Sequence, residues 1–169
     1  MQLPDVEVLT QELAQKVKPH LTTNSALVGI HTGGVWLAQA LHTKLGADIP
    51  LGMLDISFYR DDFSKEGLHP EVKPSDMPFD VTGRDVILVD DVLYTGRTVR
   101  AAINELFDYG RPASVQLVVL VDRGGRELPF SAQFVGFSLP LEEGQNIQLM
   151  QDEHGKLTLE LKEVVASTS

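Results

Sequence analysis

The sequence predicts an α/β fold with a central, mostly parallel sheet flanked by helices. Two nearly all-apolar runs, Asp85–Val89 and Val115–Val121, have the composition of strands that are covered on both faces. Residues 98–109 between them show a helical pattern, which Gly110 can end. A strand, a crossover helix and a second strand in this order lie parallel in one sheet.

The N-terminal third of the chain adds two helices and two strands to this core. A helix is expected from about residue 5 to residue 18, and Pro19 ends it. The apolar run at 27–30 predicts a short buried strand, and apolar residues at helical spacing over 35–45 predict the next helix. Residues 50–58 alternate weakly, as a strand does.

Shorter β segments are expected after the second buried strand. Residues 133–137 and 146–151 each have the pattern of a short strand, and residues 157–164 return after the turn-forming run at 152–155. No repeat or low-complexity segment divides the chain. We therefore interpret residues 1–169 as a single domain.

Residues 60–80 are expected to form a long loop. They begin with a charged run and contain three prolines, which disfavour any regular element. A structureless loop of about 20 residues is uncommon in a compact domain, and where one occurs it often serves as an active-site lid. A floppy insertion is the alternative.

Composition limits the function classes. The 169 residues suffice for a sizeable core, and the absence of cysteine excludes disulfides, thiol catalysis and Cys-based metal sites. The net charge of -10 repels polyanions. No signal peptide is apparent, and the longest apolar run, residues 117–121, is far shorter than the roughly 20 residues of a membrane helix. We expect a soluble cytoplasmic protein with no membrane partner.

The chemistry is concentrated just after the first of the two buried strands. Asp90 and Asp91 stand at the strand end where open α/β sheets bind their ligands. A loop with Thr95, Gly96 and Thr98 then opens a helix, whose free backbone N–H groups attract an anion. Neither the Walker loop nor the dinucleotide fingerprint is present. Acceptors for a diol beside donors for a phosphate match a ribose 5-phosphate.

This segment resembles the phosphoribosyl pyrophosphate motif of type I phosphoribosyltransferases. Its spelling, VILVDDVLYTGRT, is similar to that of the PyrR family, which combines pyrimidine operon regulation with uracil phosphoribosyltransferase activity. The resemblance extends over residues 27–153, and further agreeing segments lie at 55–62, 81–83, 110–112 and 121–129. It implies the type I phosphoribosyltransferase fold, with a lid at about 60–80 and a small β hood at about 122–153.

The resemblance also implies the residues of the site. Asp90 and Asp91 are expected to act in catalysis by holding the ribose hydroxyls and Mg²⁺, directly or through water, and Arg60 is expected to add a cation from the lid. The residues expected to bind phosphoribosyl pyrophosphate or nucleotide are Thr32, Gly33, Gly34, Asp90, Asp91, Val92, Leu93, Tyr94, Thr95, Gly96, Arg97 and Thr98. The residues expected at the base, under the hood, are Asp122, Arg123 and Ile147.

The expected reaction converts uracil and phosphoribosyl pyrophosphate to UMP and pyrophosphate. Tyr94 favours a pyrimidine, because the purine enzymes of this type carry Asp at that place. Gly33-Gly34 and the run 134–140 resemble purine salvage enzymes, so a purine or xanthine phosphoribosyltransferase is one alternative. PyrR proteins usually carry Arg where this chain has Gly33, so a nucleotide-sensing regulator with little catalysis is another.

The resemblance implies two macromolecular partners, leader RNA and further copies of the chain. Charge argues against the RNA, since residues 1–50 hold three Lys against four acids and residues 127–169 hold two Lys against seven acids. Strong binding commonly takes about six to ten phosphate contacts. We therefore expect RNA binding to be weakened, lost or rerouted through a protein partner, and we expect a homo-oligomer.

Other conspicuous side chains are expected to be structural. His31, His42 and His69 share no metal-ligand spacing. Trp36 lies in a predicted helix that covers the sheet, so a place in the core or at a subunit interface is favoured over stacking on a base.

Overall fold

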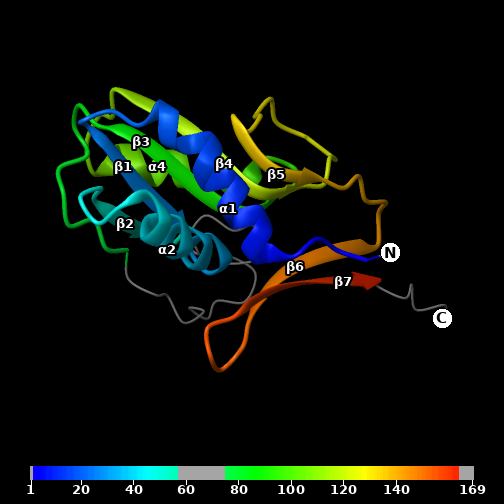
Figure 1. The fold of residues 1–169 in the computed structure, drawn as a ribbon. Coiled ribbons are helices and arrows are strands. Elements are labelled where there is room, and N and C mark those ends of the chain that lie inside the picture. Colours follow the sequence, from blue (N-terminus) through cyan, green and yellow to red (C-terminus); the bar gives the residue numbers. More distant parts are fainter. Residues whose placement is uncertain (1, 57–74, 164–169) are drawn as a thin grey trace.

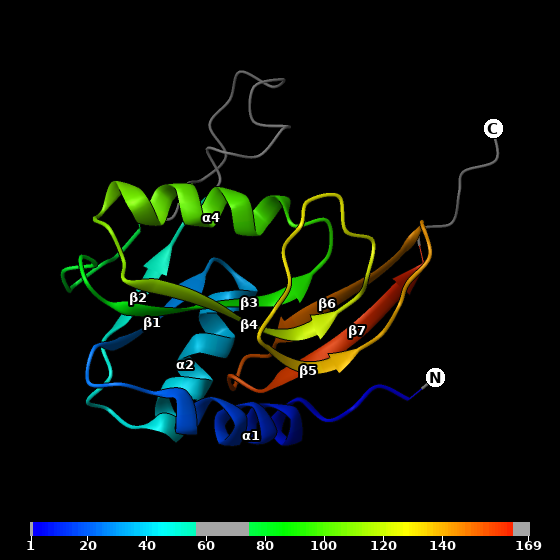
Figure 2. The same ribbon diagram turned by 90° about the horizontal axis from the view of Figure 1, so that it is seen from above.

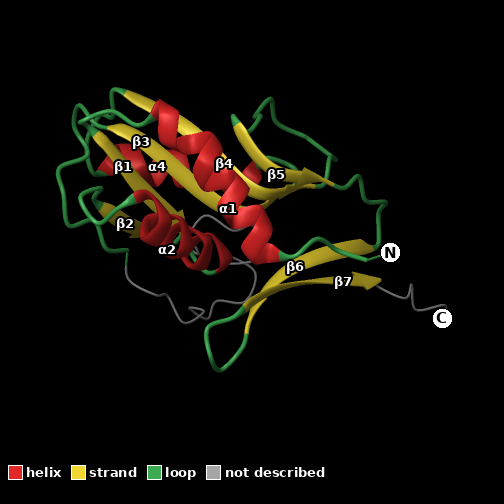
Figure 3. Cartoon of the chain, in the orientation of Figure 1, coloured by secondary structure: helices red, strands yellow, loops and turns green. Residues whose placement is uncertain are grey.

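The computed structural model describes residues 2–56 and 75–163. They form a five-stranded parallel sheet of order β2-β1-β3-β4-β5 and a separate antiparallel hairpin, β6-β7 (Figure 1, Figure 3). The strands are β1 Ser25–Ile30, β2 Leu51–Leu54, β3 Asp85–Leu93, β4 Ser114–Asp122, β5 Phe134–Ser138, β6 Gln145–Gln151 and β7 Leu157–Glu163. The α/β fold class predicted from the sequence is confirmed.

Helices cover both faces of the sheet (Figure 2). Helices α1 (Val6–Val17) and α2 (Gly33–Leu45) lie on one face, and α4 (Arg97–Asp108) lies on the other. The side chain of Asp5 caps α1 by accepting from the backbone N–H of Glu7 at 2.8 Å. None of the helices in the described part of the chain is long and apolar enough to cross a membrane.

The core is divided into two clusters by the sheet. Along β3, Ile87 and Val89 pack in the cluster that α1 and α2 cover, whereas Val86 and Leu88 pack in the cluster that α4 covers. Successive side chains of a strand point to opposite faces, so a strand with both faces buried is apolar throughout. This is why the runs that predicted the sheet contain so few polar residues.

Strand β3 is longer than the sequence predicted. We expected it to end at Val89, but it continues to Leu93, and both Asp90 and Leu93 are in register with residues of β4. The ladder is made by backbone groups, so two acidic side chains do not end it. The two carboxylates are therefore fixed by the sheet itself and not by a loop.

The range expected to form the hood is divided between two structures. Strand β5 pairs with β4 and joins the central sheet, because its apolar side chains extend the core; Phe134, for example, is 7% exposed. Only the hairpin β6-β7 lies outside that sheet. Ile147 and Leu149 of β6 pack in the same cluster as α1 and α2. The hairpin therefore packs against the rest of the domain through these apolar side chains.

Two further expectations need adjustment at the edges of elements. Pro19 does not end the helical backbone abruptly, since a 3₁₀ turn at Lys18–His20 contains it near its start, where proline is tolerated. The strand expected at 50–58 stops at Leu54. Arg60 and most of the expected lid lie outside the described residues, while residues 75–80 form no helix or strand beyond an isolated bridge from Asp76 to Met53.

The carboxyl group of Glu105 on α4 is partly enclosed beside β2. The hydroxyl of Ser75 donates to Glu105 Oε1 at 2.8 Å and accepts from the backbone N–H of Asp55 at 2.9 Å. Glu105 Oε2 is buried without a hydrogen-bond partner among the described residues. Burial raises the pKa of Glu105; the hydrogen bond from Ser75 opposes the rise, and the negative charges of Asp55 and Asp108 add to it.

Glu105→Gln is expected to be as stable as the parent at pH 7.5 or about 0.5 kcal/mol more stable, a small gain because the carboxyl is partly solvated. A raised folded-state pKa means that the carboxyl's contribution is fully present below the unfolded value of 4.5 and is lost as the pH rises through the folded value. The advantage of the variant should therefore vanish below about pH 4.5. Urea unfolding at several pH values measures it, with the exposed Glu12→Gln as the control for net charge. An advantage that grows on acidification would contradict the prediction.

Candidate functional site

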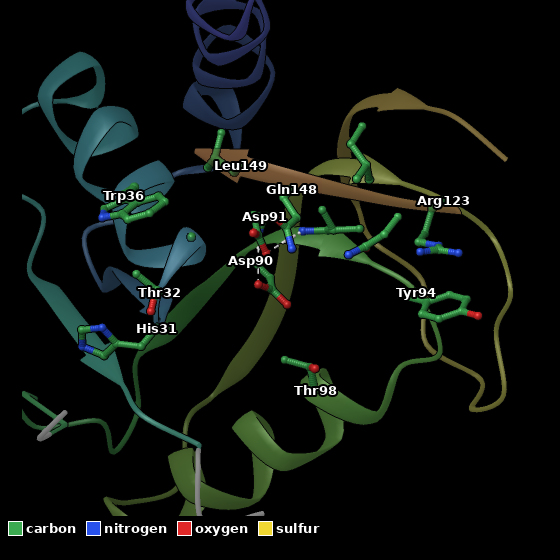
Figure 4. Close-up of a pocket in the computed structure, with 14 residues that line it drawn as sticks. His31, Thr32, Trp36, Asp90, Asp91, Tyr94, Thr98, Arg123, Gln148 and Leu149 are labelled. Carbon is green, nitrogen blue, oxygen red and sulfur yellow. Dashed lines mark hydrogen bonds between the residues drawn. The ribbon is translucent and has the colours of Figure 1, made fainter. Parts of the chain in front are cut away.

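The sheet has a switch point between β1 and β3. From β1 the chain passes through α2 to β2 on one side, and from β3 it passes through α4 to β4 on the other. The carboxyl ends of two adjacent strands therefore open a crevice where ligands bind in open α/β sheets. A pocket of about 430 Å³ lies there, and β6 forms its far wall (Figure 4).

Most of the residues predicted for the site meet in this pocket. Thr32, Gly33, Asp90, Asp91, Val92 and Tyr94 line it. Thr98, Arg123 and Ile147 line it as well. Leu93, Thr95 and Gly96 line a smaller adjoining cleft of about 90 Å³, which Tyr94 and Thr98 share. Arg60 lies outside the described residues.

The two carboxylates at the end of β3 are oriented by backbone N–H groups. Asp90 Oδ1 accepts from the N–H of Asp91 at 2.8 Å, and Asp91 Oδ1 accepts from the N–H of Val92 at 2.9 Å. Asp90 is only 6% exposed. Both side chains face the pocket (Figure 4), which therefore carries preorganised acceptors for hydroxyl groups or for a hydrated cation.

The glycine pair at the start of α2 lets the helix lie against these carboxylates. A Cβ on Gly33 would overlap the carboxylate of Asp91, with the Cγ atom only 2.6 Å away. A Cβ on Gly34 would overlap the carbonyl oxygen of Val89, so Gly34 serves close packing and does not line the pocket. The first N–H groups of a helix have no partners within it, so the start of α2 offers donors to an anion beside Asp91.

The loop from Tyr94 to Gly96 shapes the smaller cleft at the start of α4. Gly96 has a φ of 95°, and a Cβ there would lie 3.2 Å from Leu128 Cβ, so both conformation and space favour glycine. Thr95 Oγ1 accepts from the N–H of Arg97 at 3.1 Å. The guanidinium of Arg97, predicted as a phosphate ligand, forms an exposed ion pair with Glu127 at 2.7 Å. The donors of this cleft therefore come mainly from the backbone and hydroxyls.

The loop after β4 brings an arginine against the ring of Tyr94. The guanidinium carbon of Arg123 lies 3.8 Å from the ring centroid of Tyr94, and Arg123 is 5% exposed. Asp122, also predicted at the base, is engaged elsewhere: Arg126 Nη2 donates to its two oxygens at 2.9 and 2.8 Å, and the N–H of Gly124 donates at 3.0 Å. Arg123 is thus the polar side chain that this loop presents to the pocket.

The sequence did not reveal five further lining residues: His31, Trp36, Asn146, Gln148 and Leu149. Trp36 was expected in the core or at an interface; it does pack against the core, but it also walls the pocket. Its position one turn after Thr32 was an available signal, because residues four apart share a helix face. Gln148 points toward the carboxylates (Figure 4), and nothing in its local pattern announced this.

The carboxylates of Asp90 and Asp91 could hold Mg²⁺ only if water or a bound substrate supplied the remaining ligands. Among residues 2–56 and 75–163, no group of three His, Asp or Glu side chains could hold a metal ion. Asp90 and Asp91 offer oxygen ligands of the kind Mg²⁺ prefers, but that ion commonly takes one or two carboxylates and completes its shell with water and substrate oxygens. The pair fits Mg²⁺ on those terms.

Comparison with known proteins gives a consistent result. Residues 2–152 match the phosphoribosyl transferase domain family. The chain is 51% identical over 168 residues to the bifunctional protein PyrR of Pseudomonas savastanoi pv. phaseolicola, covering 97% of this chain and 98% of that protein. It is 49% identical over 173 residues to the bifunctional protein PyrR of Pseudomonas aeruginosa, covering 100% and 99%.

Solved structures show the same fold at lower identity. A hypoxanthine phosphoribosyltransferase from Staphylococcus aureus superposes with a TM-score of 0.64 at 22% identity, covering 85% of this chain and 76% of that one. A hypoxanthine-guanine phosphoribosyltransferase from Bacillus anthracis gives 0.66 at 22% identity, covering 84% and 81%. These likenesses concern the fold alone.

Proposed function

The chain belongs to the PyrR family of phosphoribosyltransferases, and we propose that it transfers ribose 5-phosphate from phosphoribosyl pyrophosphate to uracil, forming UMP and pyrophosphate. The bond from ribose C1 to the pyrophosphate oxygen breaks, a bond from C1 to uracil N1 forms, and the N1 proton is released. One observation carries the proposal: the pocket sets the backbone-oriented carboxylates Asp90 and Asp91 between two helix N-termini. The substrate needs this combination, because it joins a diol to two anionic groups.

The two helix ends divide the anions of the substrate. We assign the 5-phosphate to the cleft at Thr95 and Gly96, where the start of α4 supplies donors, and the pyrophosphate to Thr32 and Gly33, where the start of α2 does so. Helix dipoles and free N–H groups stabilise negative charge at such ends. The start of α2 therefore favours the charge that grows on the leaving group.

The carboxylates serve the ribose. Asp90 and Asp91 would accept hydrogen bonds from its 2- and 3-hydroxyls and would hold Mg²⁺, directly or through water. When bound, the ion neutralises charge on the departing pyrophosphate. The negative charges of the two residues also stabilise the positive charge that develops on the ribose ring as the bond at C1 breaks.

The base lies between the loop of Tyr94 and Arg123 and the wall formed by β6. The carboxylate that purine enzymes of this type carry is replaced here by the Tyr94 ring, which supports a pyrimidine. Incubating the protein with phosphoribosyl pyrophosphate, Mg²⁺ and each radiolabelled base in turn tests the assignment. We expect nucleotide from uracil only and none after chelation of Mg²⁺. A purine nucleotide, or no product with any base, would overturn it.

Regulation is the second function to which the relatives' name, bifunctional protein PyrR, points. Leader RNA is the partner that the family resemblance implies, but two of the more accessible cations near the site are already paired with carboxylates. Arg126 is held by Asp122, and Arg97 pairs with Glu127. Of the other basic residues, Lys44 pairs with Glu7. We therefore propose that any regulatory role here does not use a broad RNA-binding face.

Filter binding with pyrimidine leader RNA at low salt measures this directly. We expect only weak binding, in the micromolar range or above, because 24 acidic residues outnumber 14 basic ones and Lys44, Arg97 and Arg126 are each paired with a carboxylate. Addition of UMP should not strengthen it. Nanomolar affinity that UMP enhances would show that the charge argument fails.

A further inference from the structure

Arg123 is an almost buried cation for which the described part of the chain supplies no acceptor. It is 5% exposed, and its guanidinium makes no hydrogen bond or ion pair within residues 2–56 and 75–163. Its Nε atom is enclosed without a partner. Burying a charge without an acceptor is costly, so such a side chain is uncommon unless it serves a ligand.

The neighbouring carboxylate does not neutralise this cation. Both oxygens of Asp122 accept from Arg126 Nη2, and Oδ1 also accepts from the N–H of Gly124. Arg126 Nη1 donates in addition to the carbonyl oxygen of Tyr94 at 2.7 Å. These bonds tie the end of β4 to the loop after β3, and they leave the adjacent arginine as the donor of this loop.

The guanidinium is held in place by an aromatic ring. Its carbon lies 3.8 Å from the centroid of the Tyr94 ring, within the range of a cation–π contact. Gly125 has a φ of 78° and packs closely against the ring, because a Cβ there would overlap ring atoms of Tyr94. This contact limits the movement of the ring on one side, and a guanidinium lying over the ring keeps its in-plane N–H donors for another group.

The position of Arg123 in the pocket indicates which part of a bound nucleotide it would contact. It lines the main pocket with Ile147 and Gln148 of β6, but it does not line the smaller cleft assigned to the 5-phosphate. Arg123 and Tyr94 lie together on one side of the pocket, with Thr32 and Trp36 on the other (Figure 4). The base is therefore the ligand part nearest to the guanidinium.

We propose that Arg123 is a specificity-determining residue that donates hydrogen bonds to a carbonyl oxygen of the base, and that Tyr94 fixes its orientation. A guanidinium has five donors and no acceptor, so it matches an oxo group and not an amino group. This inference rests on the proposed function, because it concerns the base end of the same site.

Calorimetric titration with UMP and with ribose 5-phosphate distinguishes failure of this inference from failure of the proposed function. Arg123→Met removes the donors while keeping an unbranched apolar side chain. We expect UMP to bind about 10- to 100-fold more weakly to this variant, as for the loss of a hydrogen bond to a charged group. Ribose 5-phosphate, which lacks a base, should bind within about twofold of the parent. Arg111→Met, which removes an exposed arginine outside the pocket, is the matched control and should leave both affinities unchanged.

Tyr94→Leu tests the positioning role. It keeps an apolar side chain but removes the ring, and it should weaken UMP binding about 3- to 10-fold more than it weakens ribose 5-phosphate binding. If Arg123→Met does not fold, Arg123→Gln serves in its place, and retained ribose 5-phosphate binding verifies the fold of either. A variant that keeps the full advantage of UMP over ribose 5-phosphate would overturn the inference. Failure of the parent to bind either ligand would instead overturn the proposed function.

Discussion

Asp91→Asn is expected to lower kcat/KM for phosphoribosyl pyrophosphate by about 10²–10³, the usual cost of removing one preorganised electrostatic group. The substitution keeps the shape of the side chain, and the amide oxygen can still accept from the N–H of Val92. It removes the charge that faces the ribose and the cation. The apparent Mg²⁺ requirement should therefore rise together with KM, because Asp90 alone would hold the ion.

Steady-state kinetics over a range of Mg²⁺ concentrations measure this effect. Asp48→Asn is a suitable control, since Asp48 is an exposed loop residue with the same chemistry far from the motif. Thermal unfolding should show that the Asp91 variant keeps its fold. Kinetics indistinguishable from the parent would count decisively against the assigned site.

Gly33→Ala is expected to lower the same kcat/KM by about 10- to 100-fold, although it adds a single methyl group. That group would overlap the Asp91 carboxylate, so the carboxylate has to leave its hydrogen bond with Val92. Gly33 is not among the glycines with positive φ, so backbone strain does not contribute. Relieving this overlap should also lower the free energy of unfolding by about 1–3 kcal/mol, as overpacking commonly does, and thermal unfolding measures that loss.

A double-mutant cycle identifies the cause of the Gly33 effect. If the methyl group acts by displacing the charge of Asp91, the combination with Asp91→Asn should cost much less than the product of the two single effects. Multiplicative effects would show that Gly33 acts independently of the carboxylate. Wild-type kinetics for Gly33→Ala would show that the added methyl group is accommodated without displacing the carboxylate, which would contradict the prediction.

The sequence predicted those parts of the fold and site that depend on residues adjacent in the chain. The apolar runs at 85–89 and 115–121 predicted the buried strands, because both of their faces are covered. Asp90 and Asp91 were placed in the site because they follow such a strand directly. Residues near Thr32 were expected to join them only because of the resemblance to phosphoribosyltransferases, and the common edge at which parallel strands end accounts for their meeting.

What the sequence left undetermined depends on contacts between distant segments. Gln148 reaches the pocket only because the hairpin β6-β7 packs against α1 and α2, a contact that no local pattern specifies. Strand β5 has the same short pattern whether it joins the central sheet or the hood. Asp122 shares the residue type of Asp90 and Asp91, and no local pattern shows that both of its oxygens accept from Arg126.

The division of the core into two apolar clusters separates the two anion sites mechanically. Helix α2, which we assign to the pyrophosphate, is anchored by Leu37 and Leu41 in one cluster, and helix α4, assigned to the 5-phosphate, is anchored by Val99 and Leu106 in the other. The sheet lies between them, so repacking under one helix has no direct route to the other. We therefore expect a substitution in the cluster under α2 to change the affinity for pyrophosphate more than the affinity for the 5-phosphate, and a substitution in the cluster under α4 to do the reverse.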